Sequence, residues 1–463
     1  MENFNFYQIT DLHYYANEVI GSYGKYFELR CSTDQKCVAE SGAIVDAAFA
    51  EIAADKDNEI VIISGDVTYD GEKVSHDLLV KKLEKLKKAG KRVFLTFATH
   101  DFDNNARGYT EIGDFKLEEY NRAELRELYN DFGWNEAISE HVPSYSYAVK
   151  MCDGWRFLLL NDDGNGRSFC GYDETLVAWI KNQAKEAKEA GERVIAVTHH
   201  PILPPAEIYP LFSHRDMLGD YETTAPMFAD LGIQFCFTGH THMQSISYLD
   251  TVRGNRLYHV NTGSICAYPA PYRKMTVTAD GIDVKTHNLK SFEWDFGGKT
   301  TEEYMKDHFL FMIKDIFDSM ENDIEHFKLL ANGFSMDAKT VDALKPVLKT
   351  LGRIINSMTF GTLGKLLLIS SKIDPLMKNV KVRDFLMELV LNLYSGVRRY
   401  TPDTVEYKGF MAVLSRLPKF LKLKDYFGNS VELPAVLEDL LYDKGEFDNT
   451  NAFLPFKDIH TSF

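Results

Sequence analysis

The segment Phe235-Cys-Phe-Thr-Gly-His-Thr-His-Met-Gln244 combines an apolar run with two histidines. Its apolar start predicts a buried strand that ends at Gly239. His240 and His242 follow, two residues apart. Side chains at positions i and i+2 of an extended segment point the same way, so these two imidazoles are well placed to bind metal. A chance surface pair is the alternative, so the hypothesis needs partners elsewhere in the chain.

Polar side chains follow four earlier predicted strands in the same way. The strands are expected at residues 4–10, 59–64, 92–98 and 193–198. The residues that follow them are, in order, Asp11 with His13, Asp66, His100, and His199. Predicted helices alternate with the strands, which indicates a βαβ architecture with its ligand site beyond the carboxyl ends of the strands. One such residue is often a helix cap or a packed histidine, but five strand ends of this kind favour a common site.

Length and composition limit the classes of protein that need to be considered. The chain has 463 residues, which predicts two domains, and its formal charge is −16. That acidity argues against general binding to nucleic acid or to anionic membranes, although a local pocket for an anionic substrate stays open. The six cysteines show no Cys-x-x-Cys pair, so we expect them to be reduced. We find no signal peptide and no apolar run of about 20 residues, and we expect a cytoplasmic protein without a membrane span.

The pattern changes after about residue 300, where the polar motifs stop and helical periodicity takes over. Helices are expected at 301–331, 337–351, 353–372, 379–398, 405–422 and 433–443. The sequence therefore predicts a first domain over residues 1–298 and a helical domain over residues 299–463.

The combination of carboxylates and imidazoles at the strand ends suits Mn, Fe, Zn or Co. There are enough of these groups for two ions, and an aspartate such as Asp66 could bridge both. Two ions about 3.5–4 Å apart can hold the oxygens of an in-line phosphoryl displacement and lower the pKa of a bound water.

Five motifs occur in a specific order along the chain. They are Asp11-x-His13, Gly65-Asp-x-x-x-x-Gly-Glu72, His100-Asp101, His199-His-Pro201 and Gly239-His-x-His242. Over about residues 5–290 this order resembles the calcineurin-like metallophosphoesterase superfamily, and its details are most similar to the bacterial phosphodiesterase-like branch. The resemblance implies an α/β fold, a four-layer α/β/β/α sandwich, here followed by a C-terminal all-helical domain.

The resemblance also implies a set of ligands for two divalent or trivalent ions of Mn, Fe or Zn. One ion would be held by Asp11, His13, Asp66 and His242, and the other by Asp66, His199 and His240. In the family an Asn completes the second set, and here Thr99 occupies its position. A hydroxyl is a poorer and shorter ligand than an amide, so we expect weaker binding there unless water, Asp101 or Asn104 substitutes.

Further roles follow from the same resemblance. His100 matches the histidine that assists at the leaving group, and Asp101 is expected to orient it. The remaining candidates for contacts behind the ligands or with substrate are His200, Asn161, Asp162, Tyr14, Arg215 and Arg273. For Asn161 and Asp162, capping of a helix or turn is an equally good explanation. For Tyr14 and the two arginines, a surface or packing role is at least as good an explanation as substrate contact.

The implied function is a metal-dependent phosphoesterase in which a metal-bridged hydroxide attacks phosphorus. The expected substrate is a phosphodiester or phosphomonoester of a nucleotide or small molecule. The alternative is a metal-binding regulatory or partner-binding protein whose catalysis is weakened because Thr99 replaces the Asn. In that alternative the helical domain would be the partner surface. In general we expect the helical domain to serve as a lid, a packing element or a surface for self-association.

Overall fold

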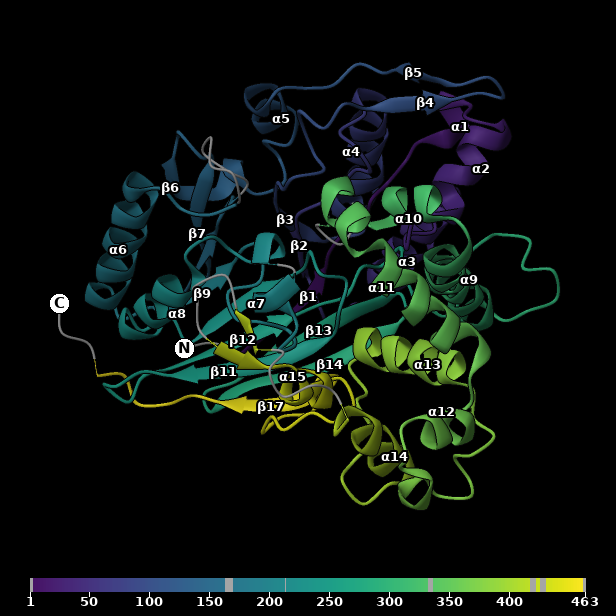
Figure 1. Cartoon of the computed structure of the whole chain (residues 1–463). Coiled ribbons are helices and arrows are strands. Elements are labelled where there is room, and N and C mark those ends of the chain that lie inside the picture. The colour runs from purple at the N-terminus through teal and green to yellow at the C-terminus, as the bar shows by residue number, and fades with distance from the viewer. Residues whose placement is uncertain are drawn as a thin grey trace. The chain divides into compact units, whose positions relative to one another are not determined.

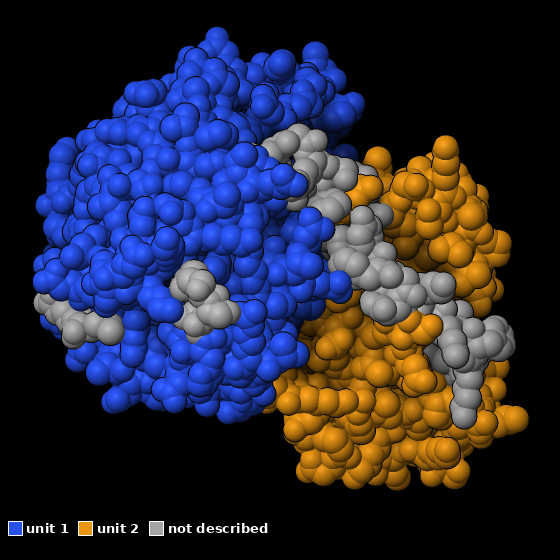
Figure 2. Space-filling view, turned by 90° about the vertical axis from the view of Figure 1, so that its left-hand side faces the viewer, with its two compact units in different colours: residues 1–205, 216–306, 446–463 blue, residues 206–215, 307–445 orange. Residues whose placement is uncertain are grey.

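The computed structural model describes residues 3–162, 170–212, 214–331, 336–416, 422–424 and 430–460. The chain forms two compact units, which Figure 2 distinguishes by colour. The first comprises Met1–Pro205, Asp216–Lys306 and Glu446–Phe463, and the second comprises Ala206–Arg215 and Asp307–Gly445. A functional boundary between residues 298 and 299 stays a prediction.

The first unit contains a six-stranded sheet whose order is β17-β14-β13-β1-β2-β3. These strands are β1 (Phe4–Ile9), β2 (Ile60–Ser64), β3 (Arg92–Thr96), β13 (Pro271–Val277), β14 (Gly281–Asn288) and β17 (Asn451–Pro455). The strands β1, β2 and β3 run parallel, whereas β13, β14 and β17 add antiparallel neighbours. The carboxyl ends of β1, β2 and β3 therefore lie at one edge.

The second sheet of this unit has seven strands in the order β11-β12-β10-β9-β8-β7-β6. They are β6 (Ala137–His141), β7 (Ser146–Cys152), β8 (Trp155–Leu159), β9 (Arg193–Val197), β10 (Phe235–Thr238), β11 (Ser245–Asp250) and β12 (Arg256–Asn261). Here β8, β9, β10 and β12 are parallel. Every residue of β8 and β10 is buried, as expected of apolar strands covered on both faces.

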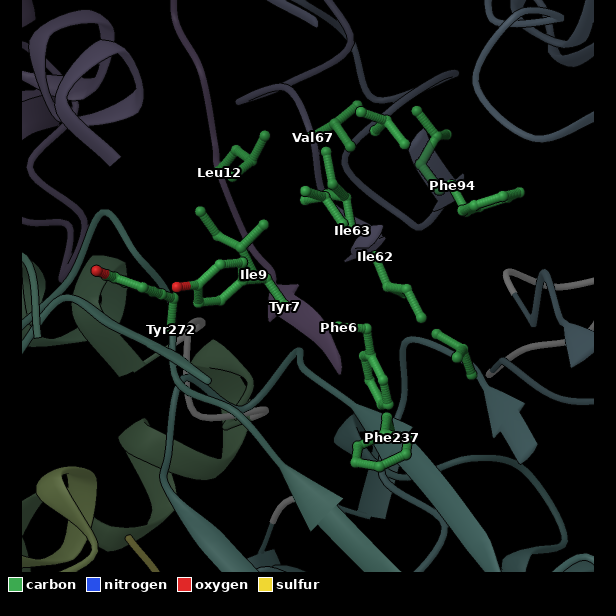
Figure 3. Close-up of a cluster of buried hydrophobic side chains, with 14 of the residues drawn as sticks. Phe6, Tyr7, Ile9, Leu12, Ile62, Ile63, Val67, Phe94, Phe237 and Tyr272 are labelled. Atoms are coloured by element: carbon green, nitrogen blue, oxygen red, sulfur yellow. The ribbon is translucent and has the colours of Figure 1, made fainter. Parts of the chain in front are cut away.

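The two sheets pack face to face through aromatic side chains. The ring of Phe6 on β1 lies edge-on to Phe237 and Phe157 of the other sheet, with centroids 5.3 and 5.5 Å apart. Figure 3 shows Phe6 directed toward Phe237. Such edge-to-face pairs contribute about 0.5–1.5 kcal/mol beyond their burial. The sandwich core thus fixes the two sheets relative to each other.

Helices cover both outer faces of the sandwich (Figure 1). The apolar faces of α3 (Ser41–Ala54) and α4 (Lys73–Lys88) belong to the core of the six-stranded sheet. On the other sheet α6 (Glu174–Glu189) packs on β9, and α8 (Tyr221–Asp230) packs on β11 and β12. The predicted four-layer α/β/β/α arrangement is confirmed.

Two segments of the first unit, after β1 and after β3, contain short regular elements. Residues 14–38 include α1 (Asn17–Ile20) and α2 (Gly24–Ser32), and residues 102–116 include the hairpin of β4 (Arg107–Tyr109) and β5 (Asp114–Lys116). The elements α5 (Arg122–Leu128) and the 3-10 helix Trp134–Glu136 follow. Short apolar runs mixed with tyrosine and glycine carry no clear period, so sequence patterns miss such elements.

The second unit is mainly helical, which confirms the helical character of the C-terminal region. Its helices are α7 (Tyr209–Phe212), α9 (Thr301–Asn322), α10 (Ile324–Ala331), α11 (Ala338–Ser357), α12 (Phe360–Leu366), α13 (Val382–Ser395), α14 (Val405–Leu414) and α15 (Leu433–Asp439). The first residues of α9 belong to the first unit, and the second unit begins within this helix at Asp307. The 3-10 helices Ser370–Lys372 and His214–Asp216 and the pair β15 (Lys422–Lys424) and β16 (Ser430–Glu432) complete the described elements. Part of the helix expected at 405–422 lies outside the described residues.

Two further properties concern the whole chain. Among the described residues, none of the helices combines the length and apolar content that a membrane crossing needs. No disulfide bond joins any of the six cysteines, all of which lie in the described ranges.

Candidate metal centre

The predicted ligands meet at the carboxyl ends of strands from both sheets. Asp11 and His13 follow β1, and Asp66 follows β2. His199 follows β9, and His240 and His242 follow β10. The backbone N–H of His240 donates to Asp11 Oδ2 (3.0 Å), which joins the two sheets at this point.

The backbone is strained at most of these positions. Asp11, His13, Asp66, His240 and His242 have φ values of 53°, 39°, 49°, 70° and 56°. Non-glycine residues in this left-handed region are uncommon, and each costs on the order of 1–3 kcal/mol. Five such residues at one place indicate that their side chains are aimed by the backbone for a function.

Glycines make the close approach of these loops feasible. A Cβ on Gly239 would lie 2.1 Å from Thr10 Oγ1 and 2.4 Å from Asp11 Oδ2. A Cβ on Gly65, at φ +87°, would lie 2.6 Å from His199 Nδ1. The glycines of the two motifs therefore leave room for the neighbouring ligands.

The first group consists of Asp11, His13 and His242. The Nε2 atoms of the two histidines are 3.1 Å apart, and Asp11 Oδ1 lies 3.3 Å from His242 Nε2 and 3.6 Å from His13 Nε2. Asp11 Oδ1 is buried and has no hydrogen-bond partner among the described residues. On the far side of the His242 ring, Nδ1 lies 2.9 Å from Gln35 Oε1, which leaves Nε2 directed inward.

The second group consists of Asp66, His199 and His240. His199 Nε2 lies 3.0 Å from Asp66 Oδ2 and 3.2 Å from His240 Nδ1. The Nδ1–H of His199 donates to the carbonyl of Ser64 (2.7 Å), which fixes the ring. Asp66 Oδ2 also lies 3.8 Å from His13 Nε2, so this carboxylate reaches both groups.

The electrostatics of the two groups favour a cation. Burial alone raises the pKa of Asp66, but its histidine neighbours hold that pKa well below the usual range, and the same balance holds for Asp11. Burial lowers the pKa of His13 well below its ordinary value and that of His240 to about 4. Despite burial, Asp66 and Asp11 raise the pKa of His199 to about 9. The carboxylates and the rings of His13 and His240 are thus in the protonation states that metal binding requires, whereas His199 would release a proton when an ion binds.

The residues present fit two metal ions. Each group offers three convergent oxygen or nitrogen atoms, and the unpartnered, buried Asp11 Oδ1 lacks the hydrogen bond that a buried carboxylate oxygen normally has. This donor set is the one that Mn, Fe and Zn accept. The assignment of individual ligands stays a prediction.

The family model for calcineurin-like phosphoesterases matches residues 4–244, more than half of the chain. The chain belongs to this family. It is therefore a metallophosphoesterase, a metal-dependent hydrolase of phosphoric ester bonds. A search of curated proteins found no match.

Solved structures that match part of this chain include two phosphatases and a nucleotidase. A dimetal phosphatase from Danio rerio matches 62% of this chain and 97% of its own, with 14% identity and a TM-score of 0.46. A purple acid phosphatase from yellow lupin matches 62% of this chain and 52% of its own, with 11% identity and a TM-score of 0.41. The NAD nucleotidase of Haemophilus influenzae matches 78% of this chain and 62% of its own, with 13% identity and a TM-score of 0.34.

The residue that follows Thr99 contacts the second group of this metallophosphoesterase. The N–H of His100 donates to Asp66 Oδ1 (3.0 Å). The two side chains expected as substitutes for the missing amide are engaged elsewhere. Asp101 accepts hydrogen bonds from the backbone N–H groups of Thr68 (3.0 Å) and Ala98 (2.8 Å). The amide of Asn104 lies against His100 and donates to Asp70.

His100 is partly exposed, as a residue that acts on substrate must be. Its Nδ1 lies 2.5 Å from the carbonyl of Tyr69 and 3.3 Å from Asp70 Oδ1, and its ring is 4.8 Å from that of His13. Burial lowers the pKa of His100, but the charges of Asp66 and Asp70 outweigh this and raise it above the ordinary value. The ring can therefore carry a proton beside the first group.

Asp101 does not have the role that the sequence suggested. Its carboxylate binds backbone N–H groups, and its pKa is raised to about 7 by burial and by Asp66. The carboxylate beside the His100 ring is that of Asp70. Sequence reasoning missed Asp70 and Gln35, although Asp70 stands inside the motif of residues 65–72.

Asp162 supports the ligand His199 from behind, whereas the hydrogen bonds of Asn161 join neighbouring loops. The Asn161 side chain accepts from Phe97 N (2.8 Å) and donates to the carbonyl of Ser144 (3.0 Å). Asp162 Oδ2 accepts from the backbone N–H groups of His199 (3.0 Å) and His200 (2.8 Å). His200 itself is buried, and its ring packs on that of His240 with centroids 4.0 Å apart.

For Tyr14 and Arg273 the structure favours the packing alternative, because both side chains are buried and form hydrogen bonds within the protein. The Tyr14 hydroxyl binds Glu18, and the ring belongs to the core. Arg273 donates to Gln244 Oε1 (2.7 Å) and to the carbonyls of Asn261 and Asn449 (3.0 and 2.8 Å). Arg215 is exposed in the second unit, and its role toward substrate stays a prediction.

Proposed function

We propose that this metallophosphoesterase hydrolyses a phosphodiester or phosphomonoester of a nucleotide or small molecule with two divalent or trivalent ions of Mn, Fe or Zn. The observation that carries the proposal is the position of Asp66. Its Oδ2 lies 3.0 Å from His199 Nε2 and 3.8 Å from His13 Nε2, so one carboxylate is shared by both ligand groups. A shared carboxylate is the arrangement that two closely spaced ions need.

When bound, the two ions would supply Lewis acidity for the phosphoryl oxygens and activate a water for in-line attack on phosphorus. The protein contributes the positions of these groups. Asp11, His13 and His242 hold one side, and His199 and His240 hold the other. Strained backbone fixes the ligand positions before substrate arrives. The rings of His199 and His242 are held by hydrogen bonds that they donate to the Ser64 carbonyl and to Gln35 Oε1.

His100 is the residue that delivers a proton to the leaving oxygen in this proposal. The Tyr69 carbonyl and Asp70 hold Nδ1, which leaves Nε2 for the substrate.

The size of the substrate is inferred from the net charge of the chain. A formal charge of −16 opposes a nucleic acid backbone, so we infer a small phosphoester rather than a polymer. Self-association through the helical region and a cytoplasmic location remain part of the proposal.

The test combines metal analysis with hydrolysis of generic phosphomonoester and phosphodiester reporters in the presence of Mn, Zn or Fe. We expect two ions per chain and turnover that Asp66→Ala abolishes. Asp153→Asn is the matched control, because this aspartate is exposed on the surface. Absence of turnover with every metal would contradict the proposal and favour a binding protein weakened at Thr99.

A further inference from the structure

A cluster of Asp162, Cys170 and His200 lies outside the two predicted ligand groups. Asp162 follows β8, Cys170 precedes α6, and His200 follows β9. One ligand atom from each side chain lies within 4.8 Å of the others. All three are buried, with exposed fractions of 0%, 7% and 1%. Buried groups of this kind need partners, and these three face one another.

Hydrogen bonds hold the cluster in place. Asp162 Oδ2 accepts from Thr198 Oγ1 (2.6 Å) and from the backbone N–H groups of His199 and His200. The N–H of Gly171 donates to the Asp162 carbonyl (2.7 Å), and the N–H of Gly219 donates to the Cys170 carbonyl. The peptide group that follows Cys170 is therefore held at both its carbonyl and its N–H.

The chemistry of the donors differs from that of the two catalytic groups. Those groups offer only oxygen and nitrogen, whereas this cluster adds a thiol sulfur. Thiolate with imidazole and carboxylate is a zinc donor set, and three protein ligands leave a fourth position for water. We propose that Asp162, Cys170 and His200 bind a third metal ion, a thiophilic divalent cation such as zinc.

The cluster has one competing explanation, a hydrogen-bonded triad without metal. His200 Nδ1 lies 2.9 Å from Asp162 Oδ1, which is also an ordinary hydrogen-bond distance. Zinc would replace the proton between these atoms and the proton of the Cys170 thiol, so that binding releases protons. The ion would also fix the His200 ring, which packs on His240, and so support the second catalytic group.

X-ray absorption at the zinc edge tests the proposal on the full-length protein, because only this cluster of the three supplies sulfur. With excess zinc we expect a sulfur scatterer at about 2.3 Å. In Cys170→Ser we expect that scatterer to vanish and the zinc content to fall by one ion per chain. Cys236→Ser is the control, since Cys236 is also buried but lies within β10; it should retain both properties.

The wild-type spectrum alone can overturn the proposal, so the test does not depend on the folding of a variant. Zinc coordinated only by nitrogen and oxygen would show that the cluster is a metal-free triad. Equal zinc content in wild type and Cys170→Ser would contradict it as well. Neither outcome depends on phosphoester turnover, so failure here is separable from failure of the proposed function.

Discussion

The two ligand groups share Asp66 but differ in completeness. In the first group, Asp11 Oδ1 has no hydrogen-bond partner among the described residues, and Gln35 orients the ring of His242. The second lacks an amide, because Thr99 stands in its place and both Asp101 and Asn104 bind elsewhere. Affinity depends on ligand number and on the groups that orient the ligands. We therefore expect the two ions to bind with unequal affinity, and the ion held by the first group to bind more tightly.

Removal of the shared carboxylate should have the largest effect. Asp66→Asn would weaken both groups at once and reduce kcat/KM by roughly 10³-fold or more, since metal charge contributes several kcal/mol to the transition state. Metal content and turnover of the variant measure this. Loss of only one ion, with the other retained at full affinity, would show that Asp66 belongs to a single group.

His100→Asn tests whether His100 donates a proton to the leaving group. General acid catalysis contributes roughly 10²–10⁴-fold, so kcat should fall by that factor for substrates with poor leaving groups. Reporters whose leaving group needs no proton should lose far less. An equal loss for both kinds of substrate would mean that His100 binds substrate and does not donate a proton.

Gln35→Ala should affect the first group alone. Loss of a residue that orients a metal ligand weakens metal binding by about 10–100-fold, so the tighter ion should bind more weakly by that factor. Stepwise metal titration measures both constants. If the weaker constant changes instead, His242 belongs with the second ion.

Thr99→Asn should bring the second group closer to the first. We expect affinity for the second ion to rise by several-fold to about tenfold, because an amide oxygen replaces a hydroxyl, and activity at limiting metal should rise with it. Thr110→Asn, on the hairpin loop, serves as the control. An unchanged second constant would show that another group already completes the site.

The smallest effect on turnover is expected from Glu72→Gln, at the end of the loop that carries Asp66. Burial, with help from Asp70, raises the pKa of Glu72 to about 8, above an unfolded value of about 4.3. Between these values the folded protein keeps a proton that the unfolded chain has lost, so stability should fall as pH rises from about 4.3 to 8. Denaturant unfolding should show a weaker decline for the variant. Parallel pH profiles would mean that Glu72 is already ionised in the folded state.

The sequence predicted the main ligands because each follows an apolar strand, and parallel strands bring such residues to one edge. Asp70 and Gln35 could not be assigned in this way, because their roles depend on loop conformations that no periodicity encodes. For Arg273 the sequence left substrate contact and packing open. In the structure β13 buries this side chain against backbone carbonyls. The sequence also did not predict that residues 451–455 form β17 beside β14 in the six-stranded sheet. Five residues after a helical region are too few to show a strand pattern.

Manganese titration followed by electron paramagnetic resonance tests the central claim most directly, because it reports both affinity and the sharing of Asp66. The first equivalent should give an isolated Mn(II) signal, and the second should convert it into a spin-coupled pair. Asp66→Asn should abolish the coupling. Two uncoupled signals, or a chain that binds a single Mn(II) at saturation, would contradict the two-ion centre.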